Sequence, residues 1–108
     1  MSLLNNNQNG FENRMNPDHI KFRVQSRAVK QFGFWAAEKL ELSGDDAECY
    51  ARQVVEADFE EPGVEDVFRK VEADFIKHKS TYTRSEMEKV FKEKYSAAEA
   101  SVAHEMNI

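Results

Sequence analysis

Apolar side chains recur at intervals of three and four residues through four segments of this chain, and only short polar breaks separate the segments. The first segment carries the pattern at Ile20, Val24, Ala28, Phe32, Trp35, Ala36 and Leu40. This spacing gives an α-helix one apolar face, and no stretch shows the sustained alternation of a surface strand. We therefore expect an all-α protein whose helices each bury one face.

The breaks between the segments predict where the helices begin and end. We expect helices over about 17–42, 45–59, 63–79 and 84–104, which together form a four-helix domain over 17–108. Ser43 and Thr83 each precede an acid by three residues, the spacing of a capping box, and Pro62 disfavours helix in the residue before it. Connections of a few residues place successive helices side by side and antiparallel. The sequence thus predicts a compact four-helix bundle, in which a close neighbouring helix would explain Gly33 inside the first helix.

Residues 1–16 differ from the rest of the chain. A run of asparagine, glutamine and glycine occupies positions 5–10, and Glu12 and Arg14 are the only charged residues of the segment. Such a composition buries too little apolar surface to offset its ordering entropy. We expect a flexible polar N-terminal tail, with Phe11 and Met15 available to contact another surface.

Composition excludes several classes of protein. A chain of 108 residues holds one domain, and its formal charge of −5 argues against a general nucleic-acid binder. No apolar run approaches the roughly 20 residues of a membrane span, so we expect no direct membrane insertion. The single cysteine, Cys49, excludes an intramolecular disulfide and fits a reducing cytoplasm. Residues 44–66 hold nine acids and one base, which predicts an acidic, solvated sector.

The inventory of reactive side chains predicts no enzyme. The four glycines are scattered, so there is no phosphate-binding loop, and the three histidines lie in different elements without metal-ligand spacing. Asp74 and His78 are four residues apart and are expected to form an exposed pair on one helix. Cys49 lies off the apolar stripe of its helix and is expected to be a half-exposed thiol without a nearby base. We predict neither a catalytic residue nor a metal ligand.

Two clusters permit a second interpretation. Phe32, Phe34 and Trp35 could stack a nucleotide base, but Phe32 and Trp35 match the core stripe, and Phe34 is the one expected to be partly exposed. Arg23, Arg27 and Lys30 share one helix face, which is either solvated or able to hold phosphates or an acidic partner. Both alternatives remain open at the level of the sequence.

Three runs of the central region together resemble one protein family: Phe32 to Leu40, Gly44 to Glu48, and Asp58 to Val67 with its Asp-Phe-Glu-Glu-Pro-Gly sequence. They are similar to the zeta-subunit family, small inhibitors of the F1FO-ATPase of alphaproteobacteria. The resemblance implies a four-helix bundle in the cytoplasm, peripherally associated with the inner-membrane ATPase. It also implies that the N-terminal region enters the F1 head and blocks ATP hydrolysis, and that adenine nucleotide binds weakly. The tail of this chain departs from the family's charged, helix-prone opening, because asparagine dominates it.

The resemblance implies a non-catalytic regulatory subunit that binds the F1 head of the F1FO-ATPase and inhibits ATP hydrolysis through its N-terminal region. The residues expected to contact the partner are Phe11, Met15, Ile20, Lys21, Phe22, Arg23, Arg27 and Lys30. The alternative is a similar bundle without inhibitory activity that binds ADP or ATP weakly as a sensor. In either case we expect no resident cofactor and a monomer when the protein is free.

Overall fold

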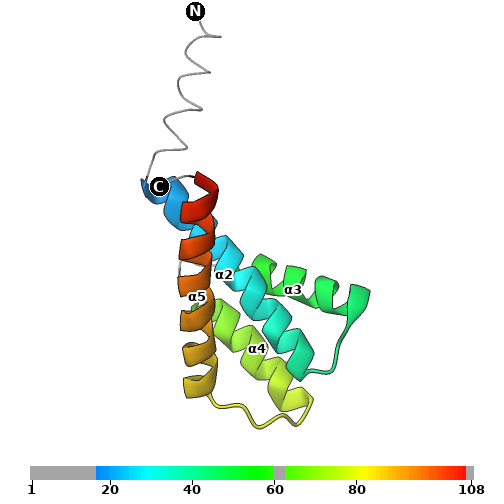
Figure 1. Ribbon diagram of the computed structural model, residues 1–108. Coiled ribbons are helices and arrows are strands. Elements are labelled where there is room, and N and C mark those ends of the chain that lie inside the picture. Colours follow the sequence, from blue (N-terminus) through cyan, green and yellow to red (C-terminus); the bar gives the residue numbers. More distant parts are fainter. Residues whose placement is uncertain (1–16, 60–62, 107–108) are drawn as a thin grey trace, which may run out of the picture.

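The computed structural model describes residues 17–59 and 63–106, and the tail expected over residues 1–16 lies outside them. The described residues form the helices α2 (Pro17–Lys39), α3 (Gly44–Asp58), α4 (Glu65–Lys77) and α5 (Arg84–Met106). Successive helices run in opposite directions (Figure 1). No strand occurs in the described part of the chain, and the all-α prediction is confirmed. None of the described helices is long and apolar enough to span a membrane.

One of the two predicted capping boxes forms. The Glu86 amide donates to Thr83 Oγ1 at 3.1 Å, and Glu86 Oε1 accepts from the Thr83 amide at 3.0 Å, so α5 begins as expected. Ser43 makes no side-chain capping bond at the start of α3. Asp46, the acid of that second motif, is one methylene shorter than Glu86, which leaves less reach for the reciprocal bond. The prediction of a capping box at Ser43 is therefore wrong.

Two helices end earlier than the apolar periodicity predicts, because the chain turns back in a left-handed residue. Helix α2 ends at Lys39 rather than 42, where Glu41 has φ 65° and the Leu42 amide donates to the Ala37 carbonyl at 2.9 Å. Helix α4 ends at Lys77 rather than 79, with φ 62° at Lys79 and the same type of bond from the Ser80 amide. Both are Schellman endings in which glycine is the usual left-handed residue. Helix α4 also begins two residues late, at Glu65, while α5 continues to Met106.

The main core lies among all four helices. Phe32 of α2 is fully buried and meets Phe68 of α4 and Phe91 of α5 edge to face, with ring centroids 5.6 and 5.7 Å apart. Aromatic rings in this arrangement contribute beyond the area they bury. The buried members of this core are Val29, Phe32, Ala36, Ala37, Leu40, Tyr50, Val54, Val67, Phe68, Val71, Phe75 and Met87. Trp35 packs against this cluster, and Phe34 is half-buried, so the interpretation of Phe32 and Trp35 as core is confirmed.

A second, smaller core joins only α2 and α5. It consists of Val24 and Ala28 from the first half of α2 and Ala98 and Val102 from the last half of α5. Ile20, Tyr95 and Met106 pack around it. Figure 1 shows these halves continuing beyond α3 and α4 to the end where the helical chain starts and finishes. We call residues 20–28 and 95–106 the two-helix extension.

The α2–α3 contact is close at Gly33, as expected from a glycine inside a helix. A Cβ atom added to Gly33 would lie 3.0 Å from the Ala51 Cα and 3.2 Å from the Val54 Cβ. The missing side chain therefore lets the two helix backbones approach each other. This contact fixes the middle of α3 against the middle of α2.

Candidate partner-binding surfaces around helix α2

The predicted partner-binding residues do not form one surface. Phe11 and Met15 lie outside the described residues. The other six are all on α2, where they divide among four places. Arg23 and Arg27 face α5, and Ile20 and Lys21 line a groove. Phe22 stacks on Phe59, and Lys30 lies beside a separate hollow. Whether any of the eight binds a partner remains a prediction.

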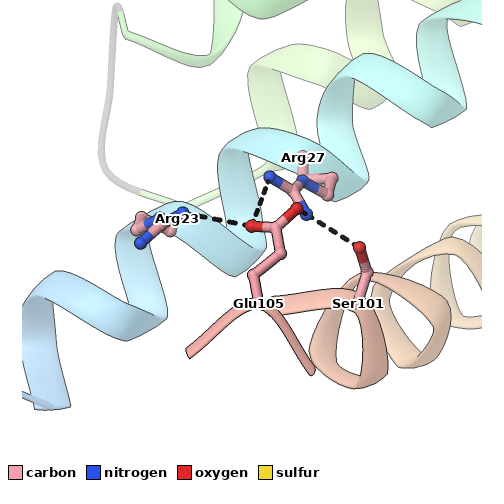
Figure 2. A network of polar contacts seen from close by, with 4 residues as sticks. All are labelled: Arg23, Arg27, Ser101 and Glu105. Atoms are coloured by element: carbon pink, nitrogen blue, oxygen red, sulfur yellow. Dashed lines mark hydrogen bonds and ion pairs between the residues drawn. The ribbon is translucent and has the colours of Figure 1, made fainter. Parts of the chain in front are cut away.

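Arg23 and Arg27 hold one flank of the two-helix extension closed (Figure 2). Arg27 Nη1 donates to Glu105 Oε2 at 2.7 Å, and its Nη2 donates to Oε1 at 3.1 Å, which makes the pair bidentate. Arg27 Nη1 also donates to Ser101 Oγ at 2.8 Å, and Arg23 Nη2 reaches Glu105 Oε1 at 3.1 Å. The hydrogen bond from Arg27 lowers the pKa of Glu105 from its usual range. These two arginines therefore have an internal role in joining α2 to α5.

Ile20 and Lys21 line a groove on the extension, which we call the α2–α5 groove. Its volume is about 360 Å³, and Val24, Tyr95 and Val102 contribute to its lining. The lining is mostly apolar, with Lys21 and Glu99 as its charged residues. This is a concave apolar surface of the kind that accepts a side chain or a small ligand.

Phe22 and Phe59 form an exposed aromatic pair. Their ring centroids are 6.2 Å apart and the rings are stacked, yet 55% and 61% of the two residues remain accessible to solvent. Phe59 continues the apolar spacing of α3, and that spacing alone predicts a buried residue. This prediction is wrong, because Phe59 lies just beyond the end of the helix and contacts the exposed Phe22 instead of the core. Large exposed aromatic residues in contact with each other are typical of interaction sites.

Lys30 lies beside a separate hollow between α2 and α3. This hollow has a volume of about 220 Å³ and is lined by Phe34 and Val55 together with Lys30, Arg52 and Glu48. Two cations next to a half-buried aromatic ring suit an anion attached to a planar group. Phe34 and Lys30 belong to two separate clusters in the sequence, and Arg52 is not predicted from it because this residue is on another helix.

The remaining polar clusters have structural partners. Tyr50 Oη donates to Asp74 Oδ2 at 2.7 Å. The pKa of Tyr50 is raised mainly by burial of the side chain and also by this hydrogen bond. Lys70 Nζ also reaches Asp74 at 3.1 Å, whereas His78 Nε2 lies 3.3 Å from Glu41 Oε1. The predicted Asp74–His78 pair is therefore wrong, because each side chain has a nearer partner on another element or turn. Cys49 is exposed, and residues 17–59 and 63–106 contain no group of three metal-ligating side chains arranged around one point.

Sequence reasoning missed several residues of these surfaces. Glu105 and Ser101 were not identified because their contact with α2 depends on how far α5 is shifted along it. Tyr95 and Glu99 belong to the groove for the same reason. The acid opposite Arg23 and Arg27 can be identified only when the position of α5 along α2 is known.

Comparison with known families identifies the chain's relationship. The family model described as ATPase inhibitor subunit zeta matches residues 1–101. The match spans the N-terminal segment, all of α2, α3 and α4, and most of α5. Comparisons with curated proteins and with solved structures found no match.

Proposed function

Because the chain belongs to the ATPase inhibitor subunit zeta family, we propose that it is a regulatory subunit that binds the F1 head of the F1FO-ATPase and inhibits ATP hydrolysis through its N-terminal region. The observation that carries this proposal is the family match itself, which begins at residue 1 and so includes the segment before α2. The protein would act in the cytoplasm, at the periphery of the membrane that holds the ATPase.

The structure supports separate roles for the two parts of the chain, in which residues 1–16 inhibit and the helices α2 to α5 hold that segment at the partner. The bidentate Arg27–Glu105 pair and the packing of Val24 against α5 hold the first turns of α2 in place. These contacts therefore hold the start of α2 beside α5, and residues 1–16 enter a larger partner from that end of the molecule. The exposed Phe22–Phe59 pair, five residues beyond Pro17, is placed to contact the same partner.

The direct test compares the intact protein with a chain that begins at Pro17, which retains both described cores. We expect the intact protein to slow hydrolysis by isolated F1, and the shortened chain to need at least about tenfold more protein for the same effect. Unchanged hydrolysis at saturating intact protein contradicts the proposal, and equal inhibition by both chains contradicts the role of the N-terminal region.

The aromatic pair gives a second arm to this test. Phe22→Ser is expected to weaken inhibition, because it removes an exposed anchor without opening either core. Ile76→Ser is the matched control, since Ile76 is 70% exposed but lies on α4, away from the first turns of α2. Equal inhibition by the two variants would mean that the aromatic pair does not contact F1.

A second candidate function is weak sensing of adenine nucleotide, favoured by the hollow that contains Lys30, Phe34 and Arg52. At about 220 Å³ the hollow takes only part of a nucleotide, which fits low affinity. Titration with ADP or ATP should shift the amide signals of these three residues, and Arg52→Glu should abolish the shifts while Lys92→Glu on α5 preserves them. Absent shifts at millimolar nucleotide would contradict this function.

A further inference from the structure

The α2–α5 groove is the open side of a helix pair whose other side is closed. On one flank of the pair, Arg27 bridges to Ser101 and Glu105. The groove is on the flank bounded by Lys21 and Glu99, and the buried side chains of Val24 and Val102 contribute to its lining between the helices. With a volume of about 360 Å³, it has room for an aromatic ring and some adjoining backbone.

The chain itself supplies a segment next to this groove. Residues 1–16 immediately precede α2, whose third and fourth residues after Pro17 are the groove residues Ile20 and Lys21. Asn16 precedes a proline, which disfavours helical backbone there and so favours a change in chain direction before α2. A segment that reverses at this point can run back along the groove.

Chain length selects the residue that reaches the middle of the groove. Val24 lies seven residues into α2 from Pro17, or about 10 Å along the axis at 1.5 Å per residue. Phe11 is six residues before Pro17 and spans up to roughly 20 Å at 3.3 Å per residue, which leaves slack for the turn. Met15 is only two residues away, about 7 Å, and reaches no further than about Lys21, short of Val24. Phe11 is thus the first aromatic side chain able to reach the apolar centre.

The charges of the segment match those of the groove. Glu12 and Arg14 are the only charged residues among positions 1–16, and Lys21 and Glu99 are the charged residues of the lining. Glu12 and Arg14 follow Phe11 by one and three residues. With Phe11 in the groove, both are near enough for Glu12 to meet Lys21 and for Arg14 to meet Glu99. An uncharged or uniformly charged segment would not have this complementarity.

We propose that in the free protein the N-terminal segment folds back along the extension and Phe11 occupies the α2–α5 groove. While Phe11 occupies the groove it cannot contact F1, so Phe11 must leave the groove before the protein inhibits the ATPase. This regulatory part rests on the proposed function. The fold-back contact itself involves this chain alone, and it is testable without the ATPase.

The first experiment places a spin label at residue 9 by Asn9→Cys, in a Cys49→Ser background because Cys49 is exposed. We expect the label to broaden the amide signals of Val102 and Ala103, and Phe11→Ser to reduce that broadening. The same variant should shift the signals of the groove residues relative to wild type. The signals of Ala73 and Lys77 on α4 serve as the control and should not change.

Each alternative result overturns the fold-back. If Phe11→Ser changes neither the broadening of Val102 and Ala103 nor the chemical shifts of the groove residues, the segment passes near this region without binding in the groove. A mixture of spin-labelled chain and unlabelled ¹⁵N-enriched chain tests a second copy as the occupant. Broadening in that mixture would assign the groove to a neighbouring molecule and exclude the intramolecular contact.

A second variant links the groove to regulation. Ala103→Phe fills the groove from α5 and should displace Phe11, so inhibition of F1 is expected at about three- to tenfold lower protein concentration. Unchanged potency together with a positive spin-label result would contradict the regulatory part. If no variant inhibits F1, the proposed function fails while the spin-label result still decides the fold-back.

Discussion

At the scale of single residues, Asp58 is the buried charged side chain of the part of the chain that the structure describes. It is 8% exposed, and Gln25 Nε2 donates to its Oδ1 at 3.3 Å. Burial raises the pKa of Asp58, and the bond from Gln25 lowers it by a smaller amount. The folded protein therefore favours the protonated carboxyl, and the charge carries a cost in stability whenever the group is ionised.

We predict that Asp58→Asn raises the free energy of unfolding at pH 7 by about 1 kcal/mol, the ordinary size of a single-residue effect. A raised folded-state pKa destabilises the wild type at pH values above that pKa, and the penalty is absent below the unfolded value near 3.9. The difference between the two proteins should thus disappear as the pH falls below about 4. Urea unfolding at several pH values measures it, with the exposed Glu93→Gln as control. A difference that grows on acidification contradicts this assignment.

At the scale of elements, the packing of α3 on α2 depends on the absent side chain of Gly33. Alanine favours helix over glycine by about 1 kcal/mol, so Gly33→Ala would stabilise an isolated α2. In the bundle the new Cβ would lie 3.0 Å from the Ala51 Cα, and overpacking of this kind costs about 1–3 kcal/mol. The helices must therefore separate or shift.

We predict that Gly33→Ala lowers the free energy of unfolding by up to about 2 kcal/mol. The loss should be smaller in an Ala51→Gly background, because that change also removes the Ala51 Cβ 3.3 Å from the added atom. Chemical denaturation of the four members of this double-mutant cycle measures the coupling. A higher free energy of unfolding for Gly33→Ala would contradict this prediction, because it would mean that α3 moves away from α2 with little loss of stability.

The same elements show how far the sequence predicts the structure. Apolar spacing predicted the four helices of the described residues, and the Thr83–Glu86 motif placed the start of α5 correctly. The ends of α2 and α4 were missed because Glu41 and Lys79 occupy the left-handed position where glycine is the usual signal. For the candidate surfaces, the shared face of Arg23 and Arg27 follows from their spacing. Their partner Glu105, 78 residues beyond Arg27, follows only from the register of α5 on α2.

At the scale of the whole molecule, stability is divided between two cores of unequal size. The main core draws on all four helices, whereas the two-helix extension relies on Val24, Ala28, Ala98 and Val102 together with the Arg27–Glu105 pair. A pair of helices with few buried side chains opens more readily than a body enclosed on several sides. We therefore expect the extension to open locally while the rest of the bundle remains folded.

We predict that Glu105→Ala speeds amide hydrogen exchange a few-fold in residues 20–27 and 98–105, with little change in α3 and α4. Hydrogen exchange followed by NMR measures this. Glu88→Ala is the matched control, because it removes a salt bridge to Arg84 at the other end of the same helix. The lowered pKa of Glu105 means that its contribution persists in mild acid and is lost only as the pH falls through that pKa. Uniformly faster exchange throughout the bundle would mean that the extension does not open separately.

The antiparallel pairing of α2 with α5 brings Pro17 and Met106 to the same end of the molecule (Figure 1). A fluorescent protein or affinity handle fused after residue 108 would therefore crowd the very region thought to engage the enzyme. Binding assays that immobilise the protein through its carboxyl end would underestimate its potency by obstruction alone. The exposed turn around Lys79 and Thr81, at the opposite end, is the better place to attach a dye or a surface tether.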